Sequence, residues 1–318
     1  MTISVSASNI YKSYGKDDIL KGLSLDLYQG EILALLGPNG SGKTTFIKIL
    51  ATLLTKDSGT VRILGHDIDT DANEIRHLFG YVGQDTERSA YGRLTVVENL
   101  HFFGALRGLS KKQVNAQIEK LVQYFDFQAN LNKHFGLLSG GQKQTVVIMR
   151  SLLHDPPVVY LDEPTKGLDP LIAKNIRGFL KQYVKDEHKT LLLTSHILSE
   201  VDELSSRVAL IHQGAISSVG TAQELKRAVG VDGFIELQKG LISPAITEKI
   251  LRLPPVINHD EQDGEWISFG IDNMTDAMEG IIHILRAENV ASQLRYRNVS
   301  LEDAFVYQMG LLADKFEA

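Results

Sequence analysis

The stretch from Glu31 to Thr45, EILALLGPNGSGKTT, constrains the fold more than any other part of this chain. Its first half, Ile32 to Leu36, is a short apolar run typical of a strand buried on both faces. Its second half predicts a helix that opens at Lys43 and carries an apolar stripe. The residues between them fit the pattern G-x-x-x-x-G-K-T, which predicts a phosphate-binding loop between a strand and a helix.

The residue types of this loop suit a chain of phosphates. A helix N-terminus offers unpaired N–H groups and the positive end of the helix dipole. Gly37, Gly40 and Gly42 allow the backbone to turn tightly enough to aim these groups inward. Lys43 adds a charge for the β- and γ-phosphates, and the hydroxyl of Thr44 is a hard oxygen ligand suited to Mg²⁺. A chance glycine-rich turn is the alternative, and the flanking strand and helix count against it.

Composition narrows the class of protein. The 318 residues are enough for two domains, and 43% of them are hydrophobic, so a sizeable core can form. The net charge of -6 argues against a broad nucleic-acid surface. The absence of cysteine suits a reducing compartment. No secretory leader or bilayer-spanning run is visible. We therefore expect a soluble protein whose connection to a membrane, if any, comes through a partner.

Strands on either side of the loop predict an antiparallel sheet. Residues 3–11 alternate between apolar residues and serine, the period of a half-exposed strand, with Ile3 on the apolar side. Ile19 to Tyr28 and Val61 to Leu64 continue in the same style. Tyr14 falls in the expected loop between the first two strands, where it could stack on an adenine ring or be an ordinary loop tyrosine.

A mostly helical insert should follow. A strand from Leu78 to Val82 ends at Gly83-Gln84-Asp85, and residues 86–94 are polar and irregular. Helical patterns then cover Val96 to Leu106, Lys111 to Phe125 and Gly141 to Leu153. The third helix is preceded by LSGGQ. A serine N-cap followed by two glycines can bind an anion, and a simple helix cap is the alternative.

Acidic residues follow the next buried strand. Val158 to Leu161 ends at Asp162 and Glu163, where carboxylates can serve Mg²⁺ binding and water activation. Asp162 is the better metal candidate and Glu163 the better general base. Two solvated acids are the alternative. A helix of about a dozen residues follows Pro170, and the strand Leu191 to Thr194 ends at Ser195-His196, where His196 could contact a γ-phosphate.

The last part of the chain is a different unit. Strands near Val208 to His212 and Ile216 to Val219 should close the first domain, and a helix from Thr221 to about Ala228 should follow them. Residues 234–297 then follow the order β-α-β-β-α-β, which predicts a ferredoxin-like arrangement, with a terminal helix from Leu301 to Leu312. Trp266 is most simply a packing residue. We expect a regulatory or dimerising role for this unit.

The motifs form a recognisable series. In order, they are GPNGSGKT, Gln84, LSGGQ, VVYLDEP, GLDP and Ser195-His196. Over residues 1 to about 225 the chain closely resembles the ATP-binding subunit of ABC transporters. The segment VSLEDAF at residues 299–305 is similar to the end of ATPases in drug-resistance and efflux exporters.

This resemblance implies an architecture. The fold would be α/β, a P-loop NTPase with a RecA-like core, an antiparallel β subdomain and a helical subdomain at about residues 86–155. Residues 1–225 would form the ATP-binding domain, and residues 226–318 a small α+β domain.

The resemblance also implies residue roles. Tyr14 would stack on adenine. The phosphates would be wrapped by Gly37, Pro38, Asn39, Gly40, Ser41, Gly42, Lys43, Thr44 and Thr45. Gln84 would reach Mg²⁺ and the attacking water, Asp162 would organise the Mg²⁺ site, Glu163 would polarise the water and His196 would steady the γ-phosphate. ATP held by a second subunit would be contacted by Ser139, Gly140, Gly141 and Gln142. Asp169 would lie at the subunit interface.

The implied partners are a second copy or a homologous ATPase subunit, joined head to tail, and one or more transmembrane permease subunits. The chain would then be cytoplasmic and lie on the inner face of the cell membrane through that permease, which would dock near residues 86–95. ATP binding would close the pair, hydrolysis would open it, and the permease would export a substrate. Three positions depart from the family pattern: Gly83, Thr145 and Lys166.

Two other function classes compete with this one. A soluble ABC-type ATPase could clamp a ribosome or a nucleic acid, but one P-loop, no sustained heptad run and the acidic balance argue against it. A P-loop kinase for a small molecule would leave LSGGQ and His196 without a role.

Overall fold

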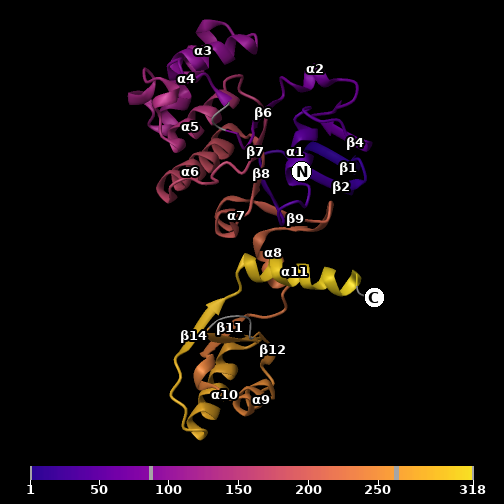
Figure 1. Cartoon of the computed structure of the whole chain (residues 1–318), viewed down its shortest axis with the longest axis vertical. Coiled ribbons are helices and arrows are strands. Elements are labelled where there is room, and N and C mark those ends of the chain that lie inside the picture. The colour runs from indigo at the N-terminus through magenta and orange to yellow at the C-terminus, as the bar shows by residue number, and fades with distance from the viewer. Residues whose placement is uncertain (1, 86–88, 261–264, 317–318) are drawn as a thin grey trace. The chain divides into compact units, whose positions relative to one another are not determined.

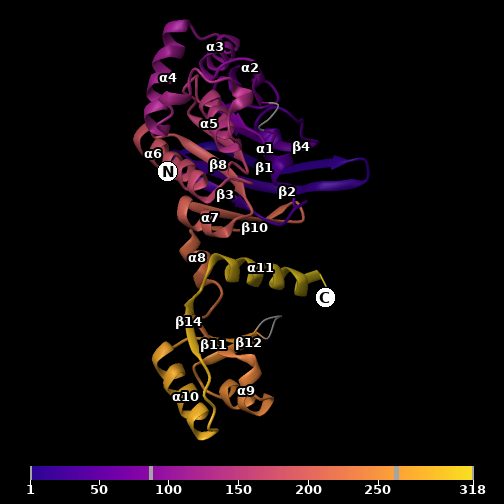
Figure 2. The ribbon, with the colours of Figure 1, turned by 60° about the vertical axis from the view of Figure 1, so that its left-hand side comes forward.

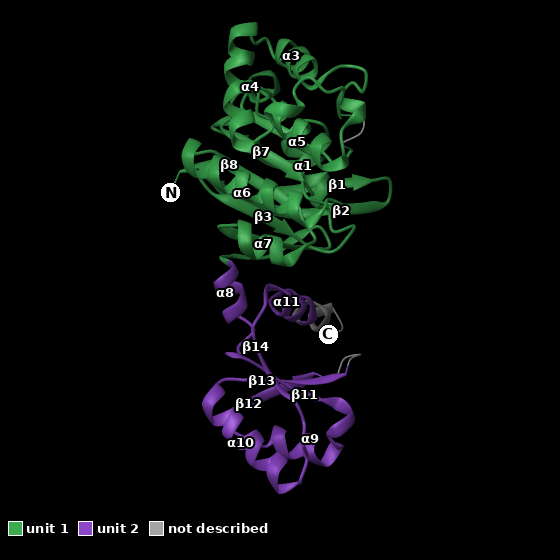
Figure 3. Ribbon diagram, turned by 90° about the vertical axis from the view of Figure 1, so that its left-hand side faces the viewer, with its two compact units in different colours: residues 1–221 green, residues 222–318 purple. Residues whose placement is uncertain are grey.

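The computed structural model describes residues 2–85, 89–260 and 265–316, and the chain divides into two compact units, residues 1–221 and 222–318 (Figure 3). The helix α8 (Ala222–Arg227) belongs to the second unit, and the domain boundary expected at residue 225 falls within this helix.

A sheet of six strands forms the centre of the first unit, in the order β10-β9-β3-β8-β7-β6; β6, β7, β8 and β9 are labelled in Figure 1. Its strands are β3 (Ile32–Leu36), β6 (Phe79–Val82), β7 (Val158–Asp162), β8 (Thr190–Ser195), β9 (Arg207–His212) and β10 (Ala215–Gly220). All pairs are parallel except β9 with β10. Every residue of β3, β7 and β8 is buried, as the apolar runs predict. The carboxyl ends of the five parallel strands therefore meet at one edge.

A second, antiparallel sheet has the order β2-β1-β4-β5. Its strands are β1 (Ile3–Tyr14), β2 (Asp17–Tyr28), β4 (Ser58–Ile63) and β5 (His66–Asp67). The helix α1 (Lys43–Leu50) lies between the two sheets, where Phe46 and Ile47 join a core with Leu23 and Leu33 (Figure 1). Burying these side chains contributes about 1.5–3 kcal/mol each to stability.

Two expectations for β1 are wrong. Ile3 is 44% exposed and Ser4 is buried, because the register with β2 shifts between Ile3 and Val5 and the Ser4 hydroxyl bonds to Thr190 Oγ1 at 3.0 Å. Tyr14 is the last residue of β1, paired with Asp17, and does not lie in a loop. The turn needs only two residues because Gly15 adopts a φ of 62°.

Helices α3 (Val96–Leu106), α4 (Lys111–Phe125) and α5 (Gly140–Ser151) lie together on one side of the unit (Figure 2). Each begins with a capping box, at Thr95, Ser110 and Ser139. The helix α6 (Pro170–Glu187) has 18 residues, so the expected dozen is wrong. Its apolar stripe continues to Val184, and it ends where His188 adopts a φ of 53°. Two short helices, α2 (Ala72–Ile75) and α7 (Leu198–Leu204), were not predicted.

The second unit has the β-α-β-β-α-β order that the sequence predicts. Its elements after α8 are β11 (Gly233–Gln238), α9 (Pro244–Leu251), β12 (Val256–Asp260), β13 (Trp266–Ile271), α10 (Met274–Ala287), β14 (Leu294–Asn298) and α11 (Leu301–Phe316). The strands form an antiparallel sheet in the order β12-β13-β11-β14. The ferredoxin-like name for this unit stays a prediction.

The core of this unit lies between its sheet and the helices α9 and α10. It contains Ile235, Phe269, Ile250 and Ile281, all fully buried. Trp266 is not part of that core. It is partly exposed and stacks under the guanidinium of Arg295, 3.7 Å from the ring centre. Trp266 therefore packs against Arg295, as expected of a packing residue, but outside the core, because the alternation of β13 puts it and the buried Ile267 on opposite faces of the sheet.

Candidate functional site

The loop between β3 and α1 contains two glycines, Gly37 and Gly42, at which a side chain would clash with neighbouring atoms. A Cβ on Gly37 would lie 2.3 Å from the carbonyl oxygen of Ile211, and Gly42 adopts a φ of 106°. The Lys43 Nζ donates to the carbonyl oxygens of Gly37 at 2.7 Å and Pro38 at 2.9 Å, so the lysine folds back over the loop. The amino end of α1 and this ammonium group therefore face the same space.

A cavity of about 330 Å³ lies at this loop. It is lined by Tyr14, Ile19, Asn39, Gly40, Gly42, Lys43, Thr44, Thr45, Gln84, Glu163 and Lys166. Burial lowers the pKa of the Lys43 ammonium, Glu163 and Asp162 act to raise it, Lys166 acts to lower it again, and the net shift is downward. The cavity thus brings together the glycine-rich loop, the tyrosine at the end of β1 and side chains from two other strand ends.

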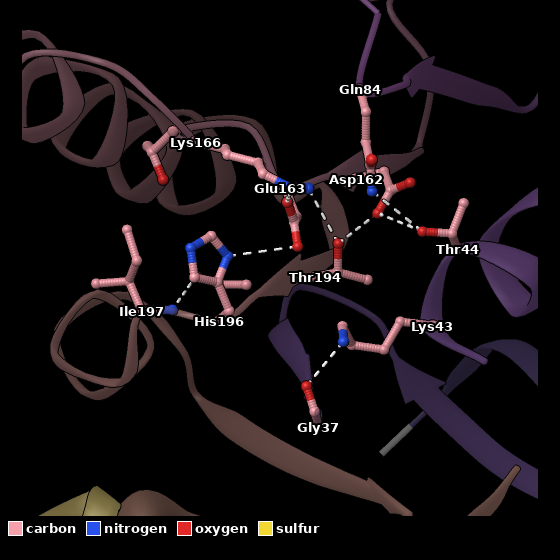
Figure 4. Close-up of polar contacts among 12 residues, drawn as sticks. Gly37, Lys43, Thr44, Gln84, Asp162, Glu163, Lys166, Thr194, His196 and Ile197 are labelled. Atoms are coloured by element: carbon pink, nitrogen blue, oxygen red, sulfur yellow. Dashed lines mark hydrogen bonds and ion pairs between the residues drawn. The ribbon is translucent and has the colours of Figure 1, made fainter. Parts of the chain in front are cut away.

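Oxygen-bearing side chains meet beside Thr44 (Figure 4). Thr44 Oγ1 donates to Asp162 Oδ1 at 3.3 Å and accepts from Gln84 Nε2 at 3.1 Å. Thr194, which pairs with Asp162 in the sheet, donates to the same carboxylate oxygen at 2.6 Å. The other oxygen, Asp162 Oδ2, is buried with no hydrogen-bond partner. Such an orphaned oxygen beside a hydroxyl and an amide suits a hard cation or a water bound to one.

Contacts fix Glu163 through its backbone N–H and through both oxygens of its carboxylate (Figure 4). Its backbone has a φ of 52°, and its N–H donates to Thr194 Oγ1 at 2.9 Å. His196 Nδ1 lies 3.4 Å from Glu163 Oε1, and Lys166 Nζ lies 2.5 Å from Oε2. Burial acts to raise the pKa of this carboxyl, but the hydrogen bond and charge of Lys166 and the charge of His196 outweigh burial and lower the pKa below its ordinary value. The group is therefore a carboxylate at neutral pH.

Sequence reasoning missed the contact of Lys166 with Glu163 and the role of Thr194. Lys166 is three residues after Glu163, and the turn between them is closed by its N–H bonding to the Glu163 carbonyl at 3.2 Å. The turn begins at Glu163, whose left-handed φ no residue pattern predicts. Thr194 was visible as the neighbour of Ser195 at the end of an apolar strand, but only the sheet order places it next to Asp162.

The LSGGQ segment lies at the start of α5, outside the cavity at the glycine-rich loop. Ser139 Oγ accepts from Gln142 N at 3.3 Å, and Gln142 Oε1 accepts from Ser139 N at 3.1 Å, so the two side chains cap α5. A Cβ on Gly141 would lie 2.6 Å from Ile172 of α6, whereas one on Gly140 would meet nothing within 4 Å. None of Ser139, Gly140, Gly141 and Gln142 lines the cavity at the glycine-rich loop.

Asp169 is the N-cap of α6 and accepts from Leu171 N at 2.9 Å; it also does not line that cavity. The structure therefore assembles Tyr14, the loop, Gln84, Asp162, Glu163 and His196 within one chain. The LSGGQ segment and Asp169 are presented at other places, each at a helix start.

The sequence of this chain is similar to those of known proteins. The family described as ABC transporter matches residues 20–166. The daunorubicin resistance ATP-binding protein DrrA3 of Streptomyces coeruleorubidus is 30% identical over 96% of both chains. The linearmycin resistance ATP-binding protein LnrL of Bacillus subtilis is 31% identical over 94% of both. The chain belongs to the ABC transporter family of ATP-binding proteins. This ABC ATPase also shares its fold with a solved structure titled as the dimeric structure of MJ0796, a bacterial ABC transporter cassette, at 26% identity and a TM-score of 0.62 over 68% of this chain and 98% of that one.

The family settles several expectations for this ABC ATPase. A P-loop NTPase fold, ATP binding and ATP hydrolysis are confirmed, and a further neighbour is titled as a post-hydrolysis state bound to ADP and Pi, with a TM-score of 0.62. Among the described residues no helix is both long enough and apolar enough to span a bilayer.

Two departures from the family pattern have local explanations in the ABC ATPase. The hydroxyl of Thr145, where a basic residue is common, donates to the Gly141 carbonyl at 3.0 Å inside α5. Gly83 leaves room for the Tyr81 side chain, whose Oη would lie 2.8 Å from a Cβ.

Proposed function

We propose that this ABC ATPase powers export of an antibiotic-class compound through a separate transmembrane permease, by ATP-driven closure of a head-to-tail pair. The substrate class rests on the resistance functions in the names of DrrA3 and LnrL. The observation that carries the closure mechanism is the cavity at the loop, which includes Lys43 and Glu163 but no residue of LSGGQ among the described residues. A second subunit would supply that segment and complete each site.

We assign Mg²⁺ to the oxygens of Thr44, Gln84 and Asp162. The orphaned Asp162 Oδ2 fits such an ion or one of its waters. The ion would supply positive charge against the β- and γ-phosphates. Tyr14, 49% exposed at the mouth of the cavity, would stack on adenine, and the loop N–H groups and Lys43 would hold the phosphates.

Hydrolysis would use Glu163 as the base. The carboxylate takes a proton from water while the water oxygen bonds to the γ-phosphorus and the bond from that phosphorus to the β-phosphate oxygen breaks, which leaves ADP and phosphate. The backbone N–H of Glu163 is fixed by its hydrogen bond to Thr194, so the backbone that carries the base needs little reorganisation. His196, 47% exposed beside Glu163, would steady the γ-phosphate as charge moves.

The test is the oligomeric state of Glu163→Gln. We expect this variant to bind ATP, to lose turnover by about 10²–10⁴-fold and to accumulate as an ATP-bound dimer in sedimentation, whereas ADP leaves it monomeric. Phosphate must be the product in the wild type. A phosphorylated small molecule would establish the kinase alternative instead, and stimulation by ribosomes or DNA but not by a permease would establish the clamp.

The permease would dock on an exposed apolar patch formed by Tyr91, which lies within the expected docking segment at residues 86–95, and by Phe102 and Leu106 of α3. Residues 86–88 of that segment lie outside the described residues. The three side chains are 52%, 39% and 67% exposed, and Tyr91 and Phe102 pack edge to face with centroids 5.0 Å apart. Exposed aromatic groups of this kind mark interaction surfaces. Through this contact the chain would lie on the inner face of the membrane.

We expect Phe102→Asp to abolish co-purification with the permease in mild detergent, because a charge would be buried at the contact. ATP hydrolysis by the isolated subunit should be unchanged. Leu53→Asp, a matched change at a residue 61% exposed after α1, should leave co-purification intact. Retention of the permease by the Phe102 variant would move the docking site elsewhere.

A further inference from the structure

Lys166 makes a contact that the family pattern does not provide for. Its ammonium lies 2.5 Å from Glu163 Oε2, while the carboxylate side chain is only 5% exposed and the lysine side chain is 54% exposed. The lysine thus reaches from solvent to the oxygen that points away from His196, which lies near Oε1. Both oxygens of the proposed base therefore face a cationic or potentially cationic group.

The same ammonium belongs to a second environment. Lys166 lines the cavity at the glycine-rich loop, as do Asn39 and Lys43 of that loop region. The Nζ of Lys43 donates hydrogen bonds to the carbonyl oxygens of Gly37 and Pro38. A triphosphate in the cavity would place a terminal phosphate, with its several negative charges, within the reach of a long flexible side chain that is already half solvated. One ammonium group cannot be fully shared by the phosphate and the carboxylate, so they would compete for it.

We propose that Lys166 is a further nucleotide-binding residue, which pairs with Glu163 in the nucleotide-free protomer and transfers to the terminal phosphate of a bound nucleoside triphosphate. The transfer frees Glu163 Oε2 for the attacking water and distinguishes a triphosphate from a diphosphate. This inference rests on the proposed function, in which the cavity takes ATP and Glu163 is the base.

Competition makes a prediction that simple repulsion does not. In Glu163→Gln the lysine loses its charged partner and is released to the phosphate, so a triphosphate should bind more tightly. If Glu163 acted only by repelling the γ-phosphate, the same gain would appear without Lys166, and would even be larger because no ammonium would offset the repulsion.

The experiment is a double-mutant cycle of wild type, Glu163→Gln, Lys166→Gln and the double variant. Isothermal titration calorimetry would measure the affinities for ADP and for the non-hydrolysable analogue AMP-PNP, at protein concentrations where sedimentation shows a monomer. With Lys166 present, Glu163→Gln should tighten AMP-PNP about tenfold relative to ADP, the size of one charge-assisted hydrogen bond. In the Lys166→Gln background the gain should fall below about twofold. Lys166→Arg should keep most of the gain, since it keeps the charge.

An equal or larger gain in the Lys166→Gln background overturns the proposal. Lys181→Gln, a matched change at an exposed lysine of α6, should leave the gain at its full size. ADP binding by each variant verifies that its loop is folded. If no variant, wild type included, binds either nucleotide, the proposed function itself fails. If ADP binds and the gain does not depend on Lys166, only the role of Lys166 fails.

Discussion

Lys43 is the residue whose loss should act on binding alone. Its ammonium is fixed over the loop by two carbonyl groups, and replacing it with alanine would remove the charge that meets the β- and γ-phosphates. We expect Lys43→Ala to weaken ATP binding by about 10- to 100-fold, the worth of one charge-assisted hydrogen-bond set. Titration calorimetry would measure this. Lys48→Ala, on the exposed side of the same helix, should bind normally; equal losses in both would mean that the charge acts at a distance.

Glu163 also predicts a pH dependence. Its pKa lies below the ordinary 4.5, so the base is ionised above that pH and is lost only as the pH falls through the lowered value. We therefore expect kcat/KM for ATP hydrolysis, which reports the nucleotide-free protomer in which Lys166 pairs with Glu163, to show no loss from this group between about pH 8 and pH 5. In Lys166→Gln the largest lowering contribution disappears and burial dominates, so the acid limb should move to higher pH. A limb at the same pH in both proteins would contradict the assignment of the base.

Some of this site was readable from residues alone. Asp162, Glu163 and His196 follow apolar runs that end at the edge of a parallel sheet, so their meeting follows from topology. The pairing of Glu163 with Lys166 was not readable. It depends on a left-handed backbone at Glu163, and glutamate has no intrinsic preference for that conformation.

At the scale of elements, α5 tests whether LSGGQ does more than cap a helix. Ser139→Arg should remove the cap, at a cost of about 1 kcal/mol in stability, and place a bulky cation at the proposed interface. We expect the isolated protomer to bind ATP normally while dimer formation with ATP is lost. Ser110→Arg at the start of α4 removes the same kind of capping box and is the control. If both variants still dimerise, Ser139 is only a cap.

The elements were predictable where one pattern dominates. The bounds of α3 and α4 follow from their capping boxes and the glycine or left-handed residue behind them, and those of β3 from its uninterrupted apolar run. The length of α6 was underestimated because no glycine or proline ends it; the helix stops at His188, whose left-handed backbone is set by its surroundings. Short elements such as β5 and α2, of two and four residues, carry too little periodicity to be found.

At the scale of the whole molecule, the class of fold was easier to predict than its topology. The P-loop pattern and the apolar runs predict a buried sheet beside the phosphate-binding loop, but the order of its strands comes only from the structure. The boundary between the units is less visible, since α8 has the composition of an ordinary surface helix and only its contacts assign it to residues 222–318.

A mixture of two inactive variants tests the proposed pair in the form that matters for transport. In a head-to-tail dimer each site takes its loop from one chain and its LSGGQ from the other. A Lys43→Ala chain has a damaged phosphate-binding loop and an intact LSGGQ segment. A Ser139→Arg chain has an intact loop and a damaged LSGGQ segment. At an ATP concentration that saturates the wild-type protein but lies well below the dissociation constant of Lys43→Ala, each variant alone should be inactive. In the mixed dimer one site joins the intact loop to the intact LSGGQ, and the other joins the two damaged halves. The mixture should therefore recover at most about half of wild-type ATPase activity, since each mixed dimer has one good site of two.

A mixture as inactive as its components, although sedimentation shows mixed dimers, would mean that each protomer must hold a complete site or that both sites must fire together. A tandem fusion with one damaged loop would separate these two outcomes: half the wild-type rate would mean that each protomer holds a complete site, and no activity would mean that both shared sites must fire together.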